Sequence, residues 1–79
     1  MTNLEKYTKV FTETFTISDE QTQNLEYQAI PEWDSVGHMG LIAELEEAFD
    51  IMFDTEDIID FSSFEKGKEI LKKYGVEIQ

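Results

Sequence analysis

A serine at the predicted start of a helix is the residue of this chain best placed to do chemistry. Asp34 precedes Ser35, and an aspartate is a good N-cap because its carboxylate accepts hydrogen bonds from the free N–H groups of the first turn. Ser35 then falls at the first helical position, where free N–H groups and the positive end of the helix dipole favour a negative group such as phosphate. A serine so placed can be a catalytic nucleophile, a phosphate acceptor, an attachment point or part of a cap.

Catalysis by Ser35 would need a general base that a third group orients. His38 is the only histidine, it lies three residues further along the same predicted helix, and no Gly-x-Ser-x-Gly turn exposes the serine. On a helical wheel His38 borders an apolar arc beside Ile42 and Leu45, so we interpret it as a partly buried packing residue. We therefore expect that the chain is not an enzyme.

The acidic residues after the second long helix resemble a calcium loop only in charge. Thr55 stands where an EF-hand loop has its glycine, and Phe61 stands where the loop ends in glutamate. We therefore expect no dedicated metal site. Three glutamates would need a cleft to act as paired catalytic acids, and we interpret them as a solvated face: Glu44, Glu46 and Glu47.

The charge of the chain restricts the kinds of partner. Its 79 residues carry 18 acidic side chains against six lysines, for a net charge of −12, and no Lys or Arg occurs between Val10 and Glu65. Such a surface repels nucleic acid and anionic lipid, whose recognition needs basic patches, and it favours partners with a basic face. The sequence has no cysteine, no membrane-length apolar run and no signal-peptide pattern. We expect a monomer in the cytoplasm.

The hydrophobic periodicity predicts a single all-α domain, residues 1–79. The expected architecture is a four-helix bundle with three longer helices, one short helix and a long first loop. The predicted helices are residues 3–15, 35–49, 55–60 and 63–74.

Local signals mark the ends of these helices. Capping boxes are predicted at Thr2–Glu5 and Ser62–Glu65, and Gly75 suits the end of the last helix. The short helix is expected to turn Ile58 and Ile59 inward. The long loop, residues 16–33, has no clean period, and five apolar residues are expected to pin it to the helices: Ile17, Leu25, Tyr27, Ile30 and Trp33.

The second long helix has two different faces. Its apolar arc contains Leu41, Ile42, Leu45 and Phe49, whereas the opposite face has small and acidic residues, Gly37 and Gly40 among them. A face this small and flat suits close approach by another protein, although the glycines are equally consistent with an exposed face without function. We expect five residues to bind partners: Val36, Gly40, Ala43, Glu44 and Glu47.

Two segments together resemble the acyl carrier protein family. They are Trp33-Asp34-Ser35-Val36-Gly37-His38-Met39 and Leu41-Ile42-Ala43-Glu44-Leu45-Glu46-Glu47-Ala48-Phe49. The family pattern is Asp-Ser-Leu followed by a helix that ends Leu-Glu-Glu-x-Phe, and the resemblance extends to the acidic balance, the long first loop and the short third helix.

The resemblance implies that Ser35, preceded by Asp34, carries a 4′-phosphopantetheine arm on which acyl groups travel as thioesters. The partners it implies are a phosphopantetheinyl transferase and acyl- or aminoacyl-loading and transferring enzymes with basic docking patches. Val36 replaces the family leucine, and Gly37 and Gly40 stand where carriers of fatty-acid synthesis have acidic or polar residues. The Trp-Asp-Ser-Val-Gly-His variant looks more like carriers of specialised pathways, such as surface-glycan or secondary-metabolite assembly, although a role in fatty-acid synthesis stays open.

Three alternatives remain at this point. The chain can be an aminoacyl carrier that an adenylating enzyme loads. It can be an acidic protein-interaction module that never receives the arm. It can also be a regulatory protein that is phosphorylated on Ser35.

Overall fold

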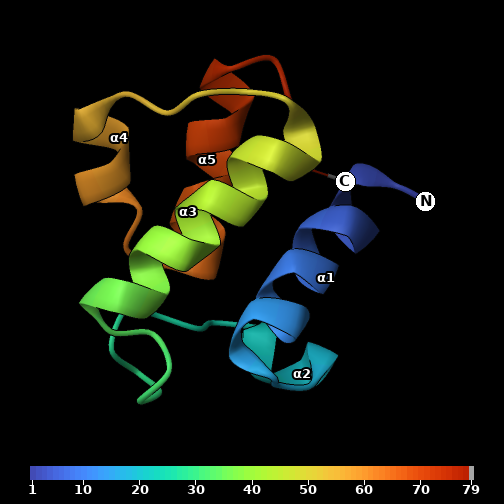
Figure 1. The fold of residues 1–79 in the computed structure, drawn as a ribbon. Coiled ribbons are helices and arrows are strands. Elements are labelled where there is room, and N and C mark those ends of the chain that lie inside the picture. The colour runs from blue at the N-terminus through green and yellow to red at the C-terminus, as the bar shows by residue number, and fades with distance from the viewer. Residues whose placement is uncertain (79) are drawn as a thin grey trace.

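A computed structural model describes residues 1–78, and over that range it contains five helices and no β-strand. The helices are α1 (Asn3–Phe15), α2 (Asp19–Thr22), α3 (Ser35–Phe49), α4 (Thr55–Asp60) and α5 (Phe64–Lys73). In Figure 1, α1 and α3 lie side by side, α5 lies behind α3, and α4 lies at the edge farther from α1. The all-α prediction is confirmed, and only the last predicted helix differs, by one residue at each end.

A short helix inside the first loop was missed by the periodicity. α2 has only four residues, too few to show a 3.6-residue period. Ser18 caps it, and a reciprocal capping box with Gln21 satisfies the N–H groups of both residues. The Ser-x-x-Gln pattern was therefore a local signal for α2 in the sequence.

The N-terminal cap of α1 is the one predicted, whereas the N-terminal cap of α5 is not. Thr2 and Glu5 form the expected capping box of α1. The predicted box from Ser62 to Glu65 is wrong, because Ser63 is the N-cap of α5 and its hydroxyl accepts from the N–H of Lys66, 2.9 Å away. Ser62 stays outside the helix, since its carbonyl accepts a hydrogen bond from the loop at Tyr27, 2.8 Å away.

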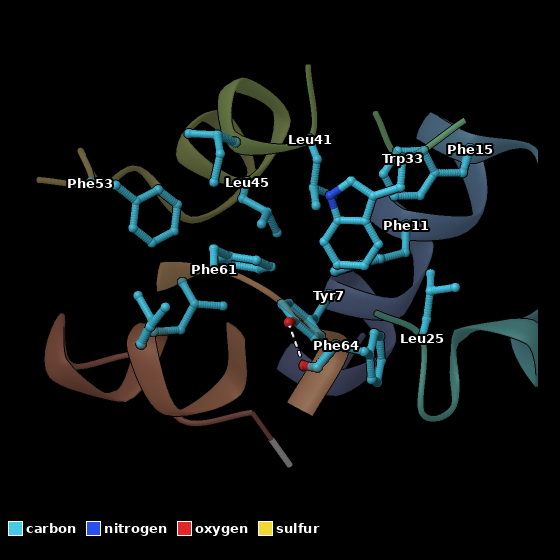
Figure 2. Close-up of a cluster of buried hydrophobic side chains, with 13 residues drawn as sticks. Tyr7, Phe11, Phe15, Leu25, Trp33, Leu41, Leu45, Phe53, Phe61 and Phe64 are labelled. Atoms are coloured by element: carbon cyan, nitrogen blue, oxygen red, sulfur yellow. Dashed lines mark hydrogen bonds between the residues drawn. The ribbon is translucent and has the colours of Figure 1, made fainter. Parts of the chain in front are cut away.

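The core is built around stacked and edge-to-face aromatic rings (Figure 2). Phe11 of α1 lies at its centre, with ring centroids 5.6 Å from Trp33 and 4.9 Å from Phe64. The buried hydroxyl of Tyr7 donates to the carbonyl of Phe64, 2.7 Å away, and so joins α1 to α5. Loop residues Leu25 and Trp33 are buried in this core, as the sequence predicted.

The short helix α4 turns a different residue inward from the one predicted. Ile59 was expected to be buried, but it is 74% exposed, whereas Ile58 packs partly against the core. Asp57 takes the inward position instead, because its carboxylate accepts from the ammonium of Lys73 at 2.6 Å and from the hydroxyl of Tyr74. A buried carboxylate is tolerated when it is paired in this way.

The two ends of the described chain lie close together, as the N and C marks in Figure 1 show. The side-chain amide of Asn3 donates to the carbonyl of Glu77, 3.0 Å away. The ammonium of Lys6 donates to the carbonyl of Ala48 at 3.1 Å, at the C-terminal end of α3, where the helix dipole favours a cation. None of the helices in residues 1–78 is long and apolar enough to cross a membrane.

Candidate functional site around Ser35

Ser35 is the first residue of α3 and is exposed, as the sequence predicted. Asp34 is the N-cap, and its Oδ1 accepts from the N–H of Gly37 at 2.8 Å. Within residues 1–78 no protein acceptor faces the N–H groups of Ser35 and Val36. The start of α3 therefore presents a hydroxyl beside two unpaired donors, an arrangement that favours a phosphate group on that hydroxyl.

A close contact within this chain explains why position 37 is a glycine. A Cβ at this position would lie 3.1 Å from the carbonyl carbon of Glu32 and within 3.0 Å of its oxygen, a separation that real Cβ atoms essentially never show. The first turn of α3 can approach the preceding loop only because residue 37 has no side chain. The interpretation of Gly37 as part of an open, flat face is therefore wrong. Gly40, in contrast, does lie on an open part of the helix surface, since it has open space around it.

Tyr27 reaches Ser35 from the long loop. Its hydroxyl lies 3.3 Å from Ser35 Oγ, and either oxygen is able to donate. The backbone fixes the base of the side chain, since the N–H of Tyr27 donates to the carbonyl of Ser62 and the next N–H, of Gln28, donates to the carbonyl of Trp33 at 3.0 Å. The sequence pointed to Tyr27 only as a packing residue, and its contact with Ser35 was not foreseen.

His38 links the loop before α3 to α4. The indole N–H of Trp33 donates to His38 Nδ1 at 2.9 Å, so Nδ1 is the acceptor and Nε2 carries the proton. Nε2 then donates to the carbonyl of Ile58, 2.7 Å away. Both ring nitrogens are used by these contacts and neither is bonded to Ser35, which agrees with the prediction of a partly buried packing residue.

A groove of about 340 Å³ opens beside the Ser35 hydroxyl, between α3 and α4. Its apolar lining includes Met39 from α3 and Ile58 and Ile59 from α4. The exposure of Ile59 thus places an isoleucine at the groove rather than in the core. A larger groove of about 810 Å³ lies among α1, α2 and α5, but both signs of charge line it and Ser35 is not part of it. We place the candidate site at the smaller groove because it contains the modifiable hydroxyl.

The five predicted partner-binding residues are all exposed along α3: Val36, Gly40, Ala43, Glu44 and Glu47. The two acidic members lie on the side of α3 that faces α1, where a shallow groove also contains Lys6 and Lys9. The remaining glutamate of this helix has a structural contact, since Glu46 Oε2 accepts from the N–H of Phe53 at 2.9 Å.

A hydrogen-bonded cluster near the groove has a structural role. It consists of Asp57, Lys73 and Tyr74. Hydrogen bonds from Lys73 and Tyr74 hold the pKa of the Asp57 carboxyl below its ordinary value, and the same contacts raise the pKa of Lys73 and of Tyr74. Asp57 precedes Ile58 of the groove, so this cluster fixes α4 against α5. Among residues 1–78 no three His, Asp or Glu side chains come together in a way that could hold a metal ion.

No protein-family model, curated protein or solved structure matches this chain.

Proposed function

We propose that the chain is an acyl carrier in which Ser35 holds a covalent 4′-phosphopantetheine arm, and that it is not itself an enzyme. The observation that carries this proposal is the exposed Ser35 hydroxyl, which stands at the start of α3 and opens onto an apolar groove. The resemblance of residues 33–49 to acyl carrier proteins supports the same function.

The residues around Ser35 fit such an arm. The unpaired N–H groups at the start of α3 suit its phosphate, and the apolar groove suits a chain that leaves Ser35 toward α4. The chain has no cysteine, and the arm supplies the thiol on which acyl groups are held as thioesters. During attachment Ser35 Oγ forms a bond to the pantetheine-side phosphorus of coenzyme A. The bond from that phosphorus to adenosine 3′,5′-bisphosphate breaks, and the serine proton passes to a base of the transferase.

The partners we propose are a phosphopantetheinyl transferase and acyl- or aminoacyl-loading and transferring enzymes with basic docking patches. Val36, Gly40 and Ala43 would form the centre of the docking face on α3, flanked by Glu44 and Glu47. Charge attraction across such a face speeds encounter more than it tightens binding, which suits a cytoplasmic monomer that visits several enzymes. The helices would then form the four-helix bundle of carriers, with α2 as a short addition in the first loop.

The specialised-pathway assignment now rests on fewer residues. Gly37 is required by its contact with Glu32, so its lack of charge says nothing about partners. Gly40 has open space around it and remains a difference that a partner would meet. We propose that the chain is a carrier of a specialised pathway, on the grounds of the Trp33–His38 segment and of Gly40. A role in fatty-acid synthesis is the alternative.

Intact mass spectrometry tests this function directly. Incubation with coenzyme A and a broad-specificity transferase should add one arm to the wild type and none to Ser35→Ala. Ser62→Ala is the matched control, because Ser62 lines the same groove but lies outside any helix start, and it should accept the arm as the wild type does.

The mass of the protein purified from its own cells distinguishes the alternatives. A gain of one phosphopantetheine supports a carrier. A gain of one phosphate on Ser35 would support a regulatory protein, which the same unpaired N–H groups would also favour. No gain in either experiment would leave the acidic interaction module as the better function.

A further inference from the structure

The loop around Tyr27 is built to fix one side chain. Asn24 and Gln28 lie on either side of it with left-handed backbone, at φ of 60° and 67°, a conformation that residues other than glycine adopt at a cost. The ring of Tyr27 packs edge-on against His38, with centroids 5.4 Å apart, and against Trp33, at 6.2 Å. A side chain held by its backbone and by two rings has little freedom to turn its hydroxyl away from Ser35.

The direction of the hydrogen bond between the two hydroxyls is open before modification and fixed after it. At 3.3 Å the contact is long for two hydroxyl groups, and a phosphodiester on Ser35 would bring further acceptor oxygens beside the Tyr27 hydroxyl. An esterified Ser35 Oγ has no proton, and a phosphodiester has only acceptor oxygens. After attachment, therefore, Tyr27 is the only possible donor of this pair.

We propose that Tyr27 is the positioning residue of Ser35. Before attachment its hydroxyl donates to Ser35 Oγ, which orients the nucleophile and leaves the serine proton free for the base of the transferase. After attachment it donates to an oxygen of the phosphodiester and holds the base of the arm beside the groove. This inference rests on the proposed carrier function and assigns a role to a residue that lies outside α3.

Tyr27→Phe tests the role, because it removes the hydroxyl and keeps the ring that packs on His38 and Trp33. The rate constant kcat for arm attachment should fall about fivefold, the factor that corresponds to one neutral hydrogen bond, while KM for the carrier stays within about twofold because the exposed face of α3 is unchanged. In the modified protein the ³¹P resonance of the phosphodiester should shift relative to the wild type.

Tyr74→Phe is the matched control, since it also removes a hydrogen-bonded tyrosine hydroxyl, but one that contacts Asp54 and Asp57. It should lower the melting temperature yet leave kcat and the ³¹P resonance at their wild-type values. If Tyr27→Phe matches the wild type in both readouts, or if Tyr74→Phe changes them equally, Tyr27 has no positioning role although the carrier function stands. If the wild type gains no arm, the carrier function itself fails, and this inference fails with it.

Discussion

Replacement of the two glycines of α3 by alanine should change the stability of the protein in opposite directions. Gly37→Ala should lower the free energy of unfolding, and Gly40→Ala should raise it. At Gly37 an added Cβ overlaps the Glu32 carbonyl, which is backbone and cannot rotate away as a side chain would. The next loop residue, Trp33, is fully buried and hydrogen-bonded to His38, so it resists the shift that would relieve the overlap. Overpacking of this kind costs about 1–3 kcal/mol. The gain in helix propensity from glycine to alanine offsets up to about 1 kcal/mol.

The net effect of Gly37→Ala should be a loss of about 1–2 kcal/mol in the free energy of unfolding, because the clash is with backbone beside a buried ring. For a chain of this size that loss lowers the melting temperature by roughly 5–15 °C. Gly40→Ala meets no atom within 4 Å, so it should keep the propensity gain, about 0.5–1 kcal/mol, and raise the melting temperature by several degrees.

Thermal and urea unfolding followed by circular dichroism at 222 nm measures both variants against the wild type. Urea slopes that match the wild type would show that the change lies in stability rather than in the unfolded state. A Gly37→Ala protein as stable as the wild type would refute the close approach of α3 to Glu32. A Gly40→Ala protein that is destabilised would refute the open surroundings of Gly40.

Three further predictions concern charge and hydrogen bonding. Because Lys73 and Tyr74 lower the pKa of Asp57, its stabilising contribution is present at neutral pH and is lost as the pH falls through that lowered pKa. Asp57→Asn should therefore be less stable than the wild type at pH 7. Urea titrations should show this gap narrowing below about pH 4, and also above about pH 10, where Lys73, whose pKa the contact raises, loses its proton; a gap independent of pH would contradict the pairing. His38→Gln should lower the free energy of unfolding by about 1–3 kcal/mol, because it removes the ring that joins the Trp33 N–H to the Ile58 carbonyl and packs on Tyr27, yet intact mass should show full arm attachment, and its loss in a folded variant would make His38 functional. Added salt should raise the wild-type melting temperature by screening the mid-chain carboxylates, and an unchanged midpoint would mean that their repulsion is already relieved.

The parts of the fold that depend on neighbouring residues were predictable from the sequence. The cap at Thr2, the cap at Asp34 and the first helical position of Ser35 follow from contacts within four residues. Gly75 also has the predicted role: its φ is 82°, and the N–H groups of residues 75 and 76 close the last turn of α5.

The parts that depend on distant partners were not predictable. The sequence favours Ser62 as the cap of α5, because Glu65 completes a capping box with it, but Ser63 is the cap because the long loop bonds to this segment, from the Tyr27 N–H to the Ser62 carbonyl and from the Phe64 N–H to the Leu25 carbonyl. Periodicity favours isoleucine over aspartate inside α4, but Asp57 is buried because Lys73, on another helix, reaches it. The candidate site shows the same division, since the position of Ser35 at the start of α3 follows from local pattern, whereas its contact with Tyr27 depends on how the long loop folds.

The proximity of the two chain ends has a consequence for how the molecule can be joined to others. Asn3 contacts Glu77, and Lys6 contacts the last turn of α3, so both ends lie by the C-terminal end of that helix. Ser35 is at its opposite end, and a helix of 15 residues separates the two by about 20 Å. A purification tag, a surface linker or a fused domain at either end would therefore leave Ser35 unobstructed, and attachment at both ends at once would hold the chain beside the C-terminal end of α3, with Ser35 at the far end of that helix.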